Sequence, residues 1–171
     1  IAKKMKEYSV KHVVLDPVMV SKTGFSLISE DAKRVLINTL IPVSTIITPN
    51  IFEGSAILGG NIKINSLEIM LDSVEKIHKL GAKRVCLKGG INIPEAPDVY
   101  YDGLTKDKTV LKIKQIQNGC DHGSGCSFSS AIAANLAKGM SYMEAVSNAK
   151  EYITVTMDNG FKPGKGIGVV N

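Results

Sequence analysis

The sequence has few aromatic residues and no tryptophan. Aromatic side chains make up 5% of its 171 residues, and its lysines are spread along the chain instead of gathering in one stretch. A surface for single-stranded nucleic acid combines basic residues with stacking rings, so this composition argues against nucleic acid as a partner. The net charge of +5 suits an anionic substrate without identifying one.

Cysteines are also scarce, and their spacing suggests neither disulfides nor a metal site. The three cysteines are Cys86, Cys120 and Cys126, an odd number that does not indicate a disulfide framework. Reduced thiols favour a cytoplasmic protein. His122, between the last two cysteines, does not complete a zinc-binding pattern. Neither a signal peptide nor an apolar run long enough to span a membrane is visible, so we expect no membrane partner.

Helix and strand patterns alternate along a chain whose length suits one domain. Short apolar runs, each ending in a polar residue, predict buried strands at 12–16, 45–48 and 84–88. Caps and apolar stripes predict helices over 29–40, 51–58, 66–80 and 141–158. A hairpin is expected over 98–102 and 109–117, at the sheet edge. This order predicts an α/β fold with a mostly parallel sheet and helices on both faces.

The most informative segment runs from residue 118 into a helix of small residues near 138. Gly123, Ser124, Gly125 and Cys126 stand at the expected start of that helix. Unpaired amides and the positive end of the helix dipole make such a start a phosphate site, and the same field favours a reactive thiolate. A glycine turn before a packing helix with an inert thiol is the structural alternative.

Polar residues at several predicted strand ends point to the same place. Asp16, Asn50 and Lys88 follow or end three strands, and ligands of open α/β sheets bind at the carboxyl ends of the strands. Each residue alone has a structural explanation, as a loop cap, a helix cap or a solvated strand end. Their convergence with the glycine-rich turn favours a phosphoryl-transfer site.

Five motifs then occur in an order that resembles a known enzyme family. The segments are LDPVMVSKTG (15–24), TPNIFE (48–53), LKGG (87–90), HGSGC (122–126) and GKGIG (164–168). Together they resemble the hydroxymethylpyrimidine/phosphomethylpyrimidine kinases of thiamine biosynthesis, in the ribokinase-like superfamily. The resemblance implies a ribokinase-like fold, ATP and Mg²⁺ as cofactors, and a small pyrimidine as substrate.

The resemblance also implies roles for individual residues. Cys126 corresponds to the general base, and the backbone of Gly123, Ser124 and Gly125 to the anion hole. Asn50 and Glu53 match an Asn-x-x-Glu pattern that organises magnesium and its waters, with Glu53 as the metal residue. The cations and carboxylate expected near the ATP phosphates are Lys88, Asp16, Lys22 and Lys165, the last in a loop that closes by the nucleotide.

The chain departs from the family pattern in two places. The family begins with a Gly-Ser-Asp-rich segment and further βα units that this chain lacks, so residues 1–171 are expected to be the C-terminal portion of one kinase domain. Cys120-Asp121 stands where the family usually has Asn-Thr, and Ser124 replaces a common threonine.

Several alternatives stay open at this point. Pyridoxal kinases share the fold and nucleotide machinery, and some share the cysteine at the position of Cys126. A degenerate nucleotide-binding module would not need Glu53, Lys88 and Cys126 together. A thiol switch between Cys120 and Cys126 is a third alternative, whereas sugar kinases generally use aspartate as the base. The oligomeric state, a homo-oligomer included, is not decided by the sequence.

Overall fold

The computed structural model describes residues 1–20, 25–90, 93–95, 97–113 and 116–171. The helices are α1 (Ala2–Glu7), α2 (Glu30–Val35), α3 (Ile51–Ile57), α4 (Leu67–His78), α5 (Ser124–Ala137) and α6 (Tyr142–Asp158). A π-helical turn, Leu36–Leu40, and a 3₁₀ turn, Ile41–Val43, follow α2. The strands are β1 (Val14–Leu15), β2 (Ile46–Ile47), β3 (Arg84–Lys88), β4 (Asp98–Asp102) and β5 (Lys108–Leu111).

One mixed sheet joins the five strands in the order β1-β2-β3-β4-β5. The first three strands are parallel, and β3, β4 and β5 pair antiparallel. The predicted parallel strands and edge hairpin are therefore confirmed, although parallel pairs make up only half of the sheet. This arrangement places the carboxyl ends of β1, β2 and β3 at one edge.

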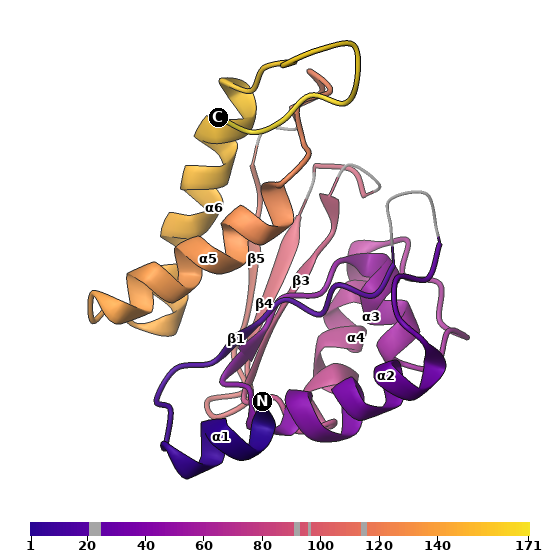
Figure 1. Ribbon diagram of the computed structural model, residues 1–171, viewed down its shortest axis with the longest axis vertical. Coiled ribbons are helices and arrows are strands. Elements are labelled where there is room, and N and C mark those ends of the chain that lie inside the picture. Colours follow the sequence, from indigo (N-terminus) through magenta and orange to yellow (C-terminus); the bar gives the residue numbers. More distant parts are fainter. Residues whose placement is uncertain (21–24, 91–92, 96, 114–115) are drawn as a thin grey trace.

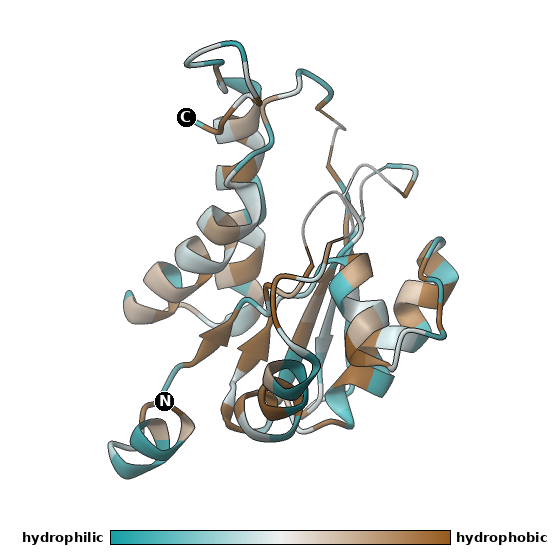
Figure 2. Ribbon diagram, turned by 45° about the vertical axis from the view of Figure 1, so that its right-hand side comes forward, coloured by the Kyte–Doolittle hydropathy of each residue, from teal (hydrophilic) through white to brown (hydrophobic). Residues whose placement is uncertain are grey.

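Helices cover both faces of the sheet, as expected (Figure 1). Successive side chains of a strand point to opposite faces, and the sheet divides the core accordingly. Ile46, Cys86 and Tyr100 pack with α5 and α6. Ile47 and Leu87 pack on the other side, with α3 and α4. Figure 2 shows the hydrophobic residues concentrated on the strands between these two layers.

Side-chain caps start most of the helices where the sequence predicted them. Ser29, Ser66 and Ser141 each accept a hydrogen bond from the third residue that follows. The segment 29–40 stays helical but changes type after Val35, and the 3₁₀ turn that follows contains Pro42, which has no N–H to donate, and ends at Val43. α1 was not predicted, because it has only one buried residue and its sequence has no apolar stripe.

Among the described residues, no helix combines the length and apolar character needed to cross a membrane.

Candidate active site

The carboxyl ends of β1 and β3 bring Asp16 and Lys88 into an ion pair. Lys88 Nζ lies 3.1 Å from Asp16 Oδ1, and the two side chains are only 16% and 14% exposed. The hydroxyl of Thr48, just past β2, donates to the same carboxylate oxygen over 3.3 Å. Three neighbouring strands thus contribute one polar residue each to one cluster. Asp16 and Lys88 were predicted from the sequence but Thr48 was not, because its only signal was a polar residue ending an apolar run.

The glycine turn before α5 starts a helix where the sequence predicted one, but the amide of Ser124, expected in the anion hole, is already hydrogen-bonded. Gly123 is the N-cap, with a φ of +88° that an L side chain rarely adopts. The amide of Ser124 donates to Asp121 O, and the helix's own hydrogen bonds begin with Ser127 N to Gly123 O. Within the part of the chain that is described, the amides of Gly125 and Cys126 have no acceptor. Both stand in the first turn of a 14-residue helix, where amides and the helix dipole favour an anion.

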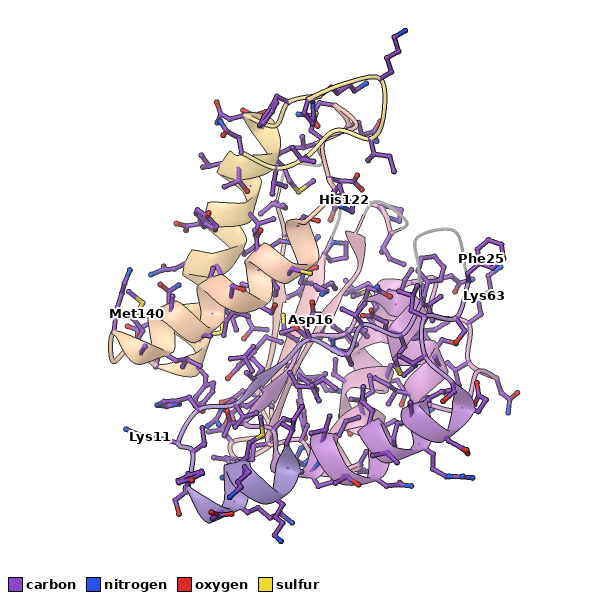
Figure 3. All side chains as sticks on the ribbon, in the orientation of Figure 1. Lys11, Asp16, Phe25, Lys63, His122 and Met140 are labelled. Atoms are coloured by element: carbon purple, nitrogen blue, oxygen red, sulfur yellow. The ribbon has the colours of Figure 1, made fainter. Side chains whose placement is uncertain are left out.

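The backbone of this turn lies against the Asp16–Lys88 ion pair. A Cβ added at Gly125 would be 3.5 Å from Lys88 Nζ and 4.0 Å from Asp16 Oδ2. Figure 3 shows Asp16 below the first turn of α5 and His122 on the loop above it. Position 125 has no side chain to fill this space. The free amides of the turn, the Lys88 ammonium group and the Asp16 carboxylate therefore lie around one small volume.

Cys126 is exposed at this helix start, whereas the other two thiols are buried. Burial raises the pKa of the Cys86 thiol far above its usual range, and the nearby Asp98 carboxylate adds to that shift. A shallow open groove of about 410 Å³ begins at Cys126 and follows α5; its lining residues are Cys126, Ser127, Ser130, Ala131, Ala134 and Tyr152. Cys126 is therefore the thiol that can reach a ligand directly.

Asn50 and Glu53 form a capping box at the start of α3. Asn50 Oδ1 accepts hydrogen bonds from the amides of Phe52 and Glu53, and Glu53 Oε2 accepts one from the amide of Asn50 over 2.9 Å. Glu53 is nearly fully buried. Burial raises its pKa, while the Asn50 amide and the charge of Lys88 oppose part of that shift. The capping explanation for the Asn-x-x-Glu pattern is thus met, and a role toward magnesium has to coexist with it.

No cluster of three or more His, Cys, Asp or Glu side chains suited to a metal ion occurs among the residues that the structure describes. Magnesium commonly binds through one or two carboxylates, with waters and substrate phosphates completing its shell. Asp16, at the edge of the cluster, fits that pattern as a direct ligand. Glu53 is buried and has one oxygen bonded to the Asn50 amide, which favours contact with the ion through water.

Glu53→Gln separates capping from catalysis. Glutamine can replace glutamate in a capping box, so α3 should form. Because the folded pKa is raised, native Glu53 retains its proton at pH values where the unfolded chain has released it, and the free energy of unfolding falls as pH rises through that window. The variant should lose this decline and be at least as stable as the parent at neutral pH, while its magnesium-dependent turnover in the complete protein falls about tenfold or more.

Urea unfolding at several pH values and turnover at limiting magnesium measure the two effects. Glu144→Gln is the matched control, because Glu144 has the same place in the exposed capping box of α6. If Glu53→Gln leaves the magnesium dependence of turnover unchanged, Glu53 only caps α3 and has no role toward the metal.

The structure does not bring every predicted residue to this cluster. Lys165 is exposed between Gly164 and Gly166, and no carboxylate of the described residues is within ion-pair distance of it. The C-terminal segment nevertheless reaches the glycine turn, since His122 N donates to Gly168 O and Val170 N to His122 O. Lys22 lies outside the described residues.

Comparisons with known proteins agree with this geometry. The family model described as phosphomethylpyrimidine kinase matches residues 1–171. The chain is 40% identical to pyridoxine kinase of Bacillus subtilis over 98% of its own length and 61% of that protein's. It is 39% identical to hydroxymethylpyrimidine/phosphomethylpyrimidine kinase of Rhizobium meliloti, over 94% of this chain and 60% of that one.

A solved structure supports the same relationship. The ADP complex of Bacillus subtilis pyridoxal kinase superposes with a TM-score of 0.88 at 37% identity, covering 99% of this chain and 62% of that chain. The chain thus spans about three fifths of the length of the curated relatives it matches. With the whole sequence matched by the family model and the strand-end cluster in place, this chain belongs to the phosphomethylpyrimidine kinase family.

Proposed function

We propose that this protein transfers the γ-phosphoryl group of ATP to hydroxymethylpyrimidine or to its monophosphate. The observation that carries the proposal is the meeting of the α5 turn with the Lys88–Asp16 pair, where Gly125 has no Cβ and Lys88 Nζ lies 3.5 Å from the place a Cβ would take. Free amides and a lysine around one small volume suit the transferred phosphoryl group.

The phosphates would be held by backbone and cation together. The amides of Gly125 and Cys126 point outward at the positive end of the α5 dipole, and Lys88 lies beside them. Lys22 and Lys165 are proposed as further cations toward the nucleotide. Gly123, with its positive φ, supplies the turn, and Ser124 begins the helix.

Cys126 is proposed as the general base. As the substrate oxygen bonds to the γ-phosphorus, its proton passes to the Cys126 thiolate and the bond from phosphorus to the ADP oxygen breaks. The exposure of Cys126 on the groove gives a substrate hydroxyl access to the sulfur. Cys126 lies in the first turn of α5, close to the Gly125 amide and to the phosphate position proposed above.

Bound magnesium would offset phosphate charge during the transfer. Asp16 is proposed as its protein ligand, and Glu53, held by Asn50, is proposed to act on its waters. The Glu53→Gln experiment above tests that division.

Pyridoxal is the second candidate substrate, favoured by the 40% identity to a pyridoxine kinase and the likeness to the pyridoxal kinase structure. Hydroxymethylpyrimidine and pyridoxal both present a hydroxymethyl group on a flat heterocycle, so for these two substrates the chemistry at Cys126 would be the same. The rest of the substrate pocket decides between them.

The decisive experiment incubates the complete protein with MgATP and each heterocycle, and follows phosphorylated product by mass spectrometry. We expect hydroxymethylpyrimidine, its monophosphate, or both to be phosphorylated, and the amides of Gly125 and Cys126 to shift in NMR spectra on MgATP binding. Phosphorylation of pyridoxal alone would establish the second candidate. Nucleotide binding without transfer to any of the three would reduce the protein to a binding module.

A further inference from the structure

A buried ion pair lies on the side of β3 and β4 that faces α6. Lys150 Nζ, from α6, is 2.5 Å from Asp98 Oδ2 at the start of β4, and the side chains are only 10% and 6% exposed. Well-packed apolar residues often stabilise a protein as much as a buried ion pair, or more. The presence of this pair in the core therefore needs a reason other than stability.

Asp98 also holds the backbone immediately after Lys88. Its Oδ1 accepts a hydrogen bond from the amide of Gly89 over 3.2 Å, and the same amide lies 2.9 Å from Pro97 O. A Cβ at Gly89 would be 2.4 Å from that carbonyl oxygen, so only glycine allows the approach. The chain that ends β3 at Lys88 is thus fixed by the segment that starts β4.

Lys150 connects this point to the helical layer that carries the glycine turn. α6 packs against α5 through a shared apolar cluster that includes Phe128, Ile132, Val146 and Ala149. The two helices lie side by side over the same face of the sheet (Figure 1). The ion pair therefore joins the start of β4, which holds the Gly89 backbone just after Lys88, to the helices that position Gly125 and Cys126.

We infer that Asp98 and Lys150 are positioning residues for phosphoryl transfer, which hold Lys88 at its working distance from the Gly125–Cys126 amides. The inference rests on the proposed function of Lys88 and Cys126. Neither positioning residue touches the nucleotide; they act through Gly89 and through α6. Errors of about 1 Å in such a geometry can lower turnover about 100-fold.

The protein contains a matched control at the opposite end of the same strands. Arg84 Nε, at the start of β3, lies 2.7 Å from Asp102 Oδ2 at the end of β4, and the pair is 12% and 15% exposed. Arg84 also stacks on Tyr142 of α6, 3.9 Å from the ring centre. This pair joins the same three elements with the same kind of chemistry, far along the strands from Lys88.

The test compares Asp98→Asn and Lys150→Met with Asp102→Asn and Arg84→Met in the complete protein. All four should lower the thermal midpoint. Only the first two should lower kcat/KM for ATP, by about tenfold or more, with the KM for the heterocycle unchanged. The double variant Asp98→Asn/Lys150→Met removes both charges of this ion pair, so it should regain part of the stability that either single variant loses, without regaining kcat/KM for ATP.

Amide hydrogen exchange provides a readout that does not depend on turnover. The Gly89 amide should exchange faster in Lys150→Met and in the double variant than in either control. Equal exchange rates at Gly89 in the Asp98 and Lys150 variants and in the two controls would overturn the inference. So would losses of kcat/KM for ATP that are proportional to the loss of stability in all four variants. Failure of the parent protein to phosphorylate any heterocycle would instead overturn the proposed function. Hydrogen exchange at the Gly89 amide would in that case still test whether Asp98 and Lys150 hold the backbone after Lys88.

Discussion

Cys126→Ala is expected to lower kcat by about 100-fold or more in the complete protein while leaving MgATP binding nearly intact, the usual scale for a lost general base. The amides of Gly125 and residue 126 belong to the backbone and survive the substitution, whereas the proton acceptor does not. Because Cys126 is exposed, the free energy of unfolding should change by less than about 0.5 kcal/mol. Calorimetric titration with MgATP and a coupled assay for ADP measure the two quantities separately.

Two further variants sharpen this result. Ser130→Ala changes the next turn of the same groove and should keep the parent kcat. Cys126→Ser should be as impaired as Cys126→Ala, because a serine hydroxyl is far less acidic than a thiol. Parent-level turnover in Cys126→Ala would mean that the thiol only lines the groove and that another group accepts the proton.

Lys88→Met should lower kcat/KM for ATP by about 100-fold, the scale measured when one preorganised electrostatic contact to a transition state is removed. The substitution removes the cation beside Gly125 and leaves the Asp16 carboxylate facing the incoming phosphates without its partner. Both changes act against the same negative charge. Initial rates at varied MgATP concentration measure the effect, and a rise in ionic strength should affect the parent more than the variant.

Lys76→Met is the matched control for charge. It removes a lysine that also pairs with an aspartate, Asp72, at 2.7 Å, but on the exposed face of α4. Exposed pairs of this kind contribute little, so its kinetics should match those of the parent. Equal kcat/KM for ATP in Lys88→Met and the parent would remove Lys88 from the proposed site.

The local features of the fold were predictable because their causes are local. A serine that accepts an amide hydrogen three residues later marks the starts of α2, α4 and α6. Short apolar runs ending in polar residues marked the strands, and their parallel order implied that Asp16 and Lys88 would converge. The change to a π-helical turn after Val35 was not predictable, since no residue pattern distinguishes it from continued α-helix.

The long-range polar contacts could not be predicted from the sequence. Lys150 is separated from Asp98 by 52 positions, and in α6 it shares the buried face with Val146 and Ile153. Lysine is rarely buried, so a sequence pattern favours an exposed position for it. In the same way, Thr48 looked like a strand end, and only the fold shows its hydroxyl bonded to Asp16.

The contact between Lys88 and Asp16 has a consequence for ligand selection. A lysine that is already paired with a carboxylate binds free anions weakly. Free phosphate would have to displace the Asp16 carboxylate from Lys88, and it would leave that carboxylate without a cation. A metal–nucleotide complex would offer both charges together: in the proposed site its phosphates would attract Lys88 while the divalent ion would bind Asp16. An exchange of partners of this kind would favour MgATP over free ATP and over inorganic phosphate, and discrimination among ligands would begin before the heterocycle arrives.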